Sequence, residues 1–386
     1  MKKLMIISFA LTLVLSAVAM AQYAAQQPDN RKSGASMKAD SITGKIGDDG
    51  KMFVSDKDST SWTITNPDAV QGPINNGVPA LFRSNYSVTT PSFMDPDAVG
   101  KPLIFIADAG LNVVDIFLQS DRKMVGQITG LSLEGLATDA ARNLYIANTG
   151  YMNILIYAPP YLTVKLTLGD GDNIPRAVAV SRKGLVAVAN VCTLSNCTGN
   201  TGSVSFFAKG STTACTTVAD ATNFAHMENA TFDGAGALYV EGEGSTPQTW
   251  NIGKIVGGCN AKKIELLKTP NLRRWIGGIQ IDNAHRIAVI NKITANGPFY
   301  IDTYNPPKNG SLGRPVSITT LRGSNASSIE NFAFLRSGLD FYDADTQNGS
   351  GSRSDEFKYP TSGPPINTIS GFGLAWGVAV TPTLLP

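Results

Sequence analysis

The feature that most constrains this sequence is a unit of about fifty residues that recurs along residues 92–386. Each unit has a short apolar segment, a tight polar turn, a second apolar segment ending in Asp, Asn or Glu, a loop, and two further apolar segments. The clearest example runs through Gly135–Asp139, Leu144–Asn148, Ile154–Pro160 and Leu162–Leu168. Short alternating segments separated by turns predict strands, so we expect each unit to be a four-stranded sheet.

The spacing of the units predicts the fold. The equivalent positions in the first segments are Ala137, Ala179, Thr231, Gln280, Ala333 and Ala379, which are 42, 52, 49, 53 and 46 residues apart. These are the lengths of propeller blades, with four strands of about five residues plus turns. A β-sandwich would not keep this phase, and helical repeats would not alternate with period two. We therefore predict an all-β chain with a six-bladed β-propeller over residues 92–386.

The two ends of the repeat region indicate how the ring closes. Residues 103–129 match the second, third and fourth strands of a blade whose first strand is missing. Gly377–Thr381 is expected to supply it, because a strand from one end that completes the blade at the other removes the open edges. Ser92–Asp95 is a competing candidate for the same place, and either assignment gives six blades.

The residues before the propeller are expected to form a signal peptide (1–21), a flexible leader (22–40), a short β-hairpin unit (41–66) and a linker (67–91). Lys2 and Lys3 precede an apolar run, and Ala19-Met20-Ala21 has the pattern of a cleavage site. This interpretation places the mature protein in the periplasm or outside the cell, with no membrane span after cleavage. The hairpin is expected around the turn Asp48-Asp49-Gly50.

Charge and cysteine content narrow the partners and the compartment. The net charge of +2 leaves no basic footprint for nucleic acid. Four cysteines in an exported chain predict two disulfides, and we prefer Cys192–Cys197, which flank one loop, with Cys215–Cys259, which lie in neighbouring repeats. Three pairings are possible. Zinc binding is the rival interpretation, but no histidine lies at ligand spacing from either pair.

The propeller topology brings two sets of side chains to one face, around the central tunnel. The first set lies just before the inner strands: Glu134, Arg176, Glu228, Gly277, Glu330 and Trp376. The second set ends the second strands: Asp108, Asn148, Asn190, Glu241, Asn291 and Asp343. Most of these carry oxygen, so we expect this face to bind an unknown small molecule or protein, and we expect the chain to be a monomer.

Three segments of the repeat carry a family resemblance. Leu144–Asn148, Ile154–Pro160 and Lys123–Gly130 resemble NHL-type propellers, above all exported bacterial ones whose third strand ends in Tyr-Ala-Pro-Pro. The resemblance covers residues 92–386. It implies the architecture and binding outside the cytoplasm rather than a particular reaction.

A more distant resemblance is to the six-bladed gluconolactonase-like family, whose members hold a divalent metal at the starts of inner strands, commonly before a Gly-Leu step. Glu134-Gly135-Leu136 matches that placement, and Glu228 and Glu330 lie at comparable positions. The resemblance implies Ca²⁺ or Mg²⁺ on these three carboxylates and a lactonase-type hydrolase as the alternative function. Arg176 departs from the pattern, because it would repel the metal or neutralise the carboxylates. The competing interpretation is a Glu–Arg network around a solvated tunnel.

Histidine chemistry of the virginiamycin B lyase type has little support in this sequence, which contains two histidines. His285 lies in a turn expected on the opposite face. His226 lies close to Glu228 on the candidate face and is positioned to act as a base. A two-histidine mechanism cannot be assembled from this pair.

Overall fold

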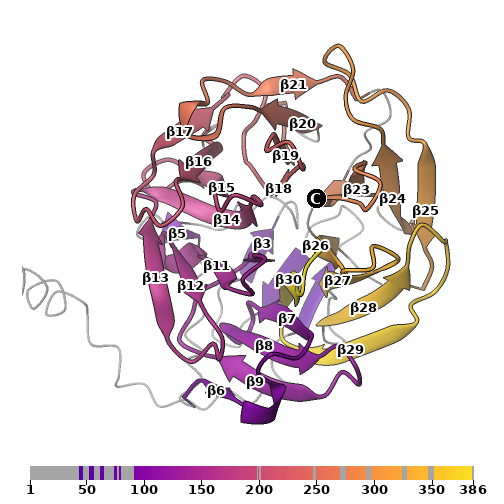
Figure 1. Cartoon of the computed structure of the whole chain (residues 1–386). Helices are drawn as coiled ribbons and strands as arrows, with labels where there is room; N and C mark the ends of the chain where they lie inside the picture. The colour runs from indigo at the N-terminus through magenta and orange to yellow at the C-terminus, as the bar shows by residue number, and fades with distance from the viewer. Residues whose placement is uncertain are drawn as a thin grey trace, which may run out of the picture. The chain divides into compact units, whose positions relative to one another are not determined.

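The computed structural model describes residues 91–384, except 198, 200, 247–248, 270–274, 293–296, 324–327 and 347–351, together with five short strands before residue 80. Six sheets follow one another around a ring (Figure 1). The predicted all-β fold with a six-bladed β-propeller is confirmed. The expected signal peptide and leader lie outside the described residues, as does most of the expected linker.

The region of the expected hairpin unit contains three strands. They form an antiparallel sheet in the order β1 (Thr43–Ile46), β2 (Met52–Ser55) and β3 (Ser61–Ile64). Within the expected linker, β4 (Ile74–Asn75) pairs with β5 (Val78–Pro79). In the described part of the chain, no helix combines the length and the apolar character needed to cross a membrane.

We number the blades from one to six along the chain and give the strands of each from the centre outwards. Blade one consists of β30 (Ala375–Thr381), β7 (Leu103–Asp108), β8 (Val113–Leu118), β9 (Met124–Ile128) and β6 (Phe93–Met94). Blade two consists of β10 (Leu136–Thr138), β11 (Leu144–Asn148), β12 (Asn153–Tyr157) and β13 (Val164–Gly169). Blade three consists of β14 (Asn173–Val180), β15 (Val186–Thr193), β16 (Ser203–Phe207) and β17 (Thr216–Ala219).

The other three blades repeat the same antiparallel order. Blade four consists of β18 (Asn229–Phe232), β19 (Leu238–Glu243), β20 (Trp250–Ile255) and β21 (Glu265–Leu267). Blade five consists of β22 (Trp275–Ile281), β23 (Ile287–Lys292), β24 (Phe299–Tyr304) and β25 (Ser317–Leu321). Blade six consists of β26 (Ser328–Phe334), β27 (Asp340–Thr346), β28 (Ser352–Lys358) and β29 (Asn367–Phe372). The six residues aligned in the sequence all lie on inner strands.

The ring is closed by β30, which lies beside β7 (Figure 1) and pairs with it from Ala375↔Asp108 to Thr381↔Leu103. The closing strand expected at Gly377–Thr381 is therefore confirmed, with two further residues at its start. The competing candidate was wrong: Phe93 and Met94 pair with β9 and add a fifth, outermost strand to blade one.

Acidic and hydroxyl side chains fix the turns between first and second strands. Asp139 accepts hydrogen bonds from the backbone and the side chain of Asn143, and Asp282 accepts from the backbone N–H groups of Ala284 and Arg286. Side chains of this kind satisfy backbone donors that a tight turn would otherwise leave unpaired. The Asp that follows the first strand of several repeats therefore has a local structural role.

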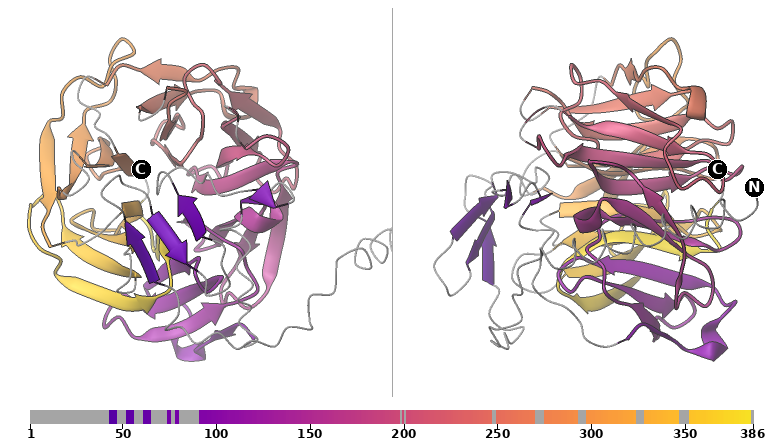
Figure 2. Two further views of the ribbon diagram at one scale, coloured as in Figure 1. Left: turned by 180° about the vertical axis from the view of Figure 1, so that it is seen from behind. Right: turned by 90° about the vertical axis from the view of Figure 1, so that its left-hand side faces the viewer.

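The core lies between blades, because the strands bury both of their faces. In β11, Leu144 and Ile146 belong to the apolar cluster shared with blade one, whereas Tyr145 belongs to the cluster shared with blade three. One such cluster lies at each of the six blade interfaces. The left view in Figure 2 shows the same ring of sheets from behind. Burial on both faces explains why several blade strands are nearly continuous apolar runs and do not alternate between apolar and polar residues.

Two disulfides are present, with the pairing that we preferred from the sequence. Cys192 and Cys197 are bonded within blade three and the loop that follows β15. Cys215 precedes β17, and its partner Cys259 lies in the short 3-10 helix Gly258–Asn260 of blade four. The second bond therefore joins neighbouring blades. Structural disulfides are typical of proteins outside the reducing cytoplasm.

Candidate functional site

Four inner strands contain a shift in register near the centre of the ring. The shifts lie at Arg176 in β14, at Gly277 and Gly278 in β22, at Glu330 in β26 and at Trp376 in β30. At each of these positions the inner strand has one residue more than its partner strand, which is a β-bulge; in β14 a second shift, at Val191 of β15, compensates for it. A bulge redirects a side chain out of the regular alternation. The sequence placed these residues just before the inner strands, but in these four blades the strand starts earlier and includes them.

The side chains converge on Arg176. Its Nη2 lies 2.8 Å from Oε2 of Glu330, and its Nη1 lies 3.5 Å from Oε2 of Glu134. Its Nε forms an ion pair with Oε2 of Glu228. The guanidinium carbon lies 4.8 Å from the ring centroid of Trp376, in a cation–π contact. We call these five residues, contributed by five blades, the central cluster.

Glycine allows the inner strands to approach one another closely at the central cluster. A Cβ atom on Gly135 would lie 2.5 Å from the carbonyl oxygen of Arg176, to which the Gly135 N–H donates a hydrogen bond of 2.9 Å. A Cβ atom on Gly377 would lie 2.4 Å from the carbonyl oxygen of Glu134. The Glu134-Gly135-Leu136 step thus has a packing reason that is independent of any metal.

The central cluster is buried. Arg176 and its three glutamate partners are at most 4% exposed, and Trp376 is also buried. The members of the second set are buried as well. The solvent contact expected of a tunnel lining is therefore missing from these side chains. They form part of the polar interior of the propeller.

Burial changes the proton affinity of the glutamates. Loss of hydration raises the pKa of Glu134 and of Glu228 to about 8 in each case, although the charge of Arg176 acts in the opposite direction. Burial likewise raises the pKa of Glu241 to about 7, against the effect of a hydrogen bond from Asn229. The cluster therefore holds protons near neutral pH that exposed carboxylates would have lost.

The side chains expected to end the second strands find partners within or beside their own blades. Only Asp108 and Asn148 are last residues, because β15, β19, β23 and β27 each continue for one to three residues further. Asp108 accepts from the backbone N–H groups of Gly373 and Leu374, just before the closing strand. Asn148 donates to Asn153, and Asn291 donates to Asp302. Asn190 donates to Ser203 and Ser205. Glu241 accepts from Asn229, and Asp343 accepts from the backbone N–H of Asp355. This set therefore does not meet at one point.

Sequence reasoning missed a second polar group that supports the central cluster. Asn229 donates to Oε1 of Glu241 at 2.8 Å and to the carbonyl oxygen of Glu330 at 3.2 Å. Asn331 donates to Oδ1 of Asn229 at 2.9 Å. The available signal was the Glu-Asn pair, which occurs at residues 228–229 and again at 330–331.

The two histidines do not form one site. Nδ1 of His226 lies 3.0 Å from Oε2 of Glu243, and the His226 side chain is buried. Burial alone would lower the pKa of His226, but the hydrogen bond to Glu243 and the charge of Glu228 raise it overall. His285 lies in the turn between β22 and β23, at the other end of the inner strands.

Comparison with known proteins supports the fold. No protein-family model and no curated protein matches this chain. A protein of unknown function from Bacteroides caccae aligns with a TM-score of 0.54 at 11% identity, covering 73% of this chain and 99% of the other. A nidogen/laminin complex aligns with a TM-score of 0.53 at 14% identity (72% and 98%), and Kuenenia stuttgartiensis hydrazine synthase with 0.50 at 12% identity (86% and 99%). At such identities the likeness concerns the fold alone, and this chain is similar to these structures as a β-propeller.

Proposed function

We propose that this protein is an exported propeller of the NHL type that acts as a binding scaffold, using the loops on one face of the ring to hold a ligand or another protein. The observation that carries the proposal is the central cluster: Arg176 is paired with all three glutamates that a lactonase-type metal site would need. The fold supplies the scaffold, and the export signal expected at residues 1–21 supplies the compartment.

The guanidinium stands where the cation of the alternative function would act. An arginine side chain stays charged at any pH at which a protein functions, so Ca²⁺ or Mg²⁺ would have to displace it from Glu134, Glu228 and Glu330. The burial of the cluster adds a second obstacle. A lactone in solution could not reach these glutamates, or a metal bound to them, because the side chains are not exposed. These two facts favour binding over hydrolysis.

The loops between second and third strands offer an accessible surface on the same face. Tyr151, in the loop after β11, is 60% exposed. The loop after β15 is held by the Cys192–Cys197 disulfide. An exposed aromatic side chain and a braced loop are features that recognition surfaces use, because little ordering entropy is lost on binding.

The test of the hydrolase alternative uses a panel of simple lactones with and without added Ca²⁺ or Mg²⁺. We expect no hydrolysis by the unaltered protein. Hydrolysis that requires the cation and is lost in Glu134→Gln would overturn the proposal.

The test of the binding proposal places a photoreactive amino acid at Tyr151 and, as a matched control, at Leu339. Leu339 is 55% exposed in the turn between β26 and β27, on the opposite face. We expect a discrete cross-linked product in the exported protein fraction or its metabolite extract from position 151 only. Equal labelling from both positions would refute the assignment of the binding face.

A further inference from the structure

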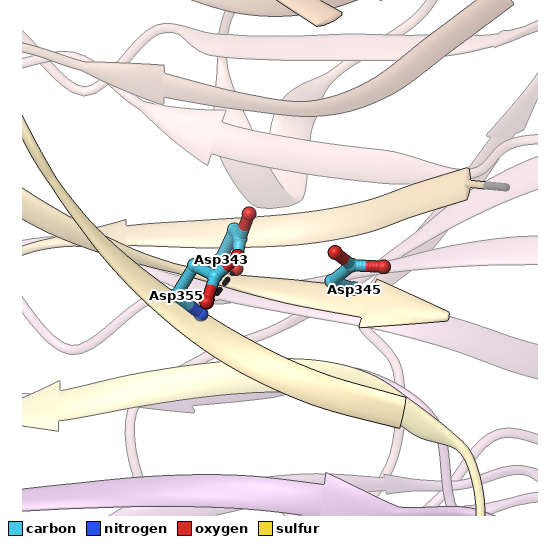
Figure 3. Close-up of side chains that lie close together, drawn as sticks. All are labelled: Asp343, Asp345 and Asp355. Atoms are coloured by element: carbon cyan, nitrogen blue, oxygen red, sulfur yellow. Dashed lines mark hydrogen bonds between the residues drawn. The ribbon is translucent and has the colours of Figure 1, made fainter. Parts of the chain in front are cut away.

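Three buried aspartates that are not members of the central cluster lie together in blade six. Asp343 and Asp345 belong to β27 and Asp355 belongs to β28 (Figure 3). Asp343 and Asp345 are two residues apart and therefore share one face of the strand. The pairing of Asp345 with Arg353 places Asp355 opposite Asp343. One carboxylate oxygen from each aspartate lies within 4.8 Å of the other two, and all three residues are 0% exposed.

The hydrogen bonds of this aspartate cluster are incomplete. Oδ1 of Asp343 accepts from the backbone N–H of Asp355 at 2.7 Å, and Oδ1 of Asp355 accepts from the hydroxyl of Thr368 at 2.6 Å. Oδ2 of Asp343 and Oδ1 of Asp345 meet no hydrogen-bond donor among the described residues. Buried carboxylate oxygens without a donor are costly, and two like charges directly opposite on adjacent strands add to that cost.

The corresponding positions in other blades show the usual solution. The equivalent side chain of the second strand faces an amide or hydroxyl in blades two and three, where Asn148 donates to Asn153 and Asn190 to Ser203. In blade five, Asn291 donates to Asp302. Blade six instead sets one carboxylate against another. A partner that supplies positive charge would complete this blade in the way that side-chain donors complete the others.

The neighbouring cations neutralise the aspartate cluster only in part. Nε of Arg353 lies 3.3 Å from Oδ2 of Asp345 and 2.9 Å from Oδ2 of Asp355. Lys292, at the end of β23 in blade five, acts on Asp345 through its charge. Oδ2 of Asp343 is left without a hydrogen-bonded cation in the described structure. With all three carboxylates ionised, the group as a whole stays negative.

We propose that Asp343, Asp345 and Asp355 form a binding site for a hard divalent cation, with Ca²⁺ as the best fit. Two oxygens bound to the same Ca²⁺ at about 2.4 Å can be separated by at most about 4.8 Å, and the three carboxylate oxygens satisfy that limit. Ca²⁺ also tolerates an irregular shell that water completes, whereas Mg²⁺ requires a nearly ideal octahedron. The site ties β27 to β28, so the cation stabilises blade six. This inference does not rest on the proposed binding function.

The test is a Ca²⁺ titration of the full chain after treatment with a chelator. Binding is measured by calorimetry, and stabilisation is measured as the change in the thermal unfolding midpoint, Tm. We expect one saturable site per chain with an affinity in the range of extracellular calcium modules, about 10⁻⁴–10⁻³ M. Saturation should raise Tm. Asp343→Asn and Asp355→Asn should each weaken binding by more than about tenfold, the smallest loss seen even for an outer-shell partner of a metal.

Two control variants locate the effect. Glu134→Gln alters the central cluster, and Asp340→Asn alters the same strand at its surface pair with Lys358; both should bind Ca²⁺ as the unaltered protein does. If the Asp343 and Asp355 variants do not fold, equilibrium dialysis of the unaltered protein still decides the question. Less than half an equivalent of Ca²⁺ per chain at about 10 mM, roughly ten times the weakest affinity expected, would overturn the proposal. Full Ca²⁺ binding by a folded Asp343→Asn variant would also overturn the proposal. The repulsion between the carboxyl groups would then be relieved by shared protons and not by a cation.

Discussion

Replacing Arg176 with methionine removes the cation that contacts three buried glutamates while keeping a long apolar stem against Trp376. Breaking a buried ion pair from one side costs about 3–5 kcal/mol, because the remaining charge is buried without compensation. In this cluster the cost depends on pH, since the glutamates can take up protons instead of staying charged.

The sign follows from the raised pKa values of Glu134 and Glu228, about 8 in the folded protein against an ordinary value of 4.5. Between these values the folded chain holds protons that the unfolded chain has released, so the contribution to stability is fully present below about pH 4.5 and is lost as the pH rises towards 8. Arg176 lowers both pKa values, and its removal raises them further. We therefore expect Arg176→Met to cost more near pH 8 than near pH 5, with the loss rising towards about 3–5 kcal/mol as the glutamates ionise.

The assay is urea unfolding of the two proteins, followed by circular dichroism, at about pH 5 and about pH 8. The matched control is Lys358→Met, which removes an exposed ion pair with Asp340 and should change little at either pH. A loss for Arg176→Met that is the same at both pH values would refute the reasoning, because it would show that the arginine acts by packing and not through the charge of its partners.

Three further changes test other parts of the structure. Glu134→Gln, which imitates the protonated side chain, should make the unfolding midpoint less dependent on pH between about 5 and 8 than in the unaltered protein. Gly277→Ala should lower the free energy of unfolding by at least about 2 kcal/mol, because the added Cβ would lie 1.6 Å from the carbonyl oxygen of Ile329. The control Gly363→Ala, whose Cβ would have no atom within 4 Å, should be nearly neutral in the same urea assay. Cys215→Ser should lower the free energy of unfolding by about 4 kcal/mol and Cys192→Ser by about 2 kcal/mol, because the two disulfides close loops of 44 and 5 residues and so restrict the unfolded chain to different degrees. Equal losses for the two variants in chemical unfolding would contradict that ranking.

The sequence predicted the blade pattern well because each blade is built from local alternation and tight turns. Aligning Ala137 with the five equivalent positions located every inner strand, and the apolar stretch at Gly377–Thr381 located the closure. The predicted propeller topology also placed Glu134, Arg176 and Glu228 around one point, because it brings the starts of the inner strands together.

The parts that the sequence did not predict depend on contacts between distant segments. Exposure of the central cluster could not be judged, because it depends on bulges that redirect Arg176, Glu330 and Trp376 into the interior. The aspartate cluster was missed for a related reason. Asp355 lies in the polar stretch Ser352–Lys358, which has a loop-like composition although it forms β28, and its position opposite Asp343 follows only from the strand register.

Closure of the ring by β30 also determines the order in which the protein can be completed. Leu374 donates its N–H to Asp108, which was added to the chain 266 residues earlier. At a synthesis rate of about 5–20 residues per second, β7 has to wait on the order of tens of seconds for its inner neighbour. During that time its backbone N–H and C=O groups form an open edge that another strand could pair with. Blade one is thus the first blade to be made and the last to be finished.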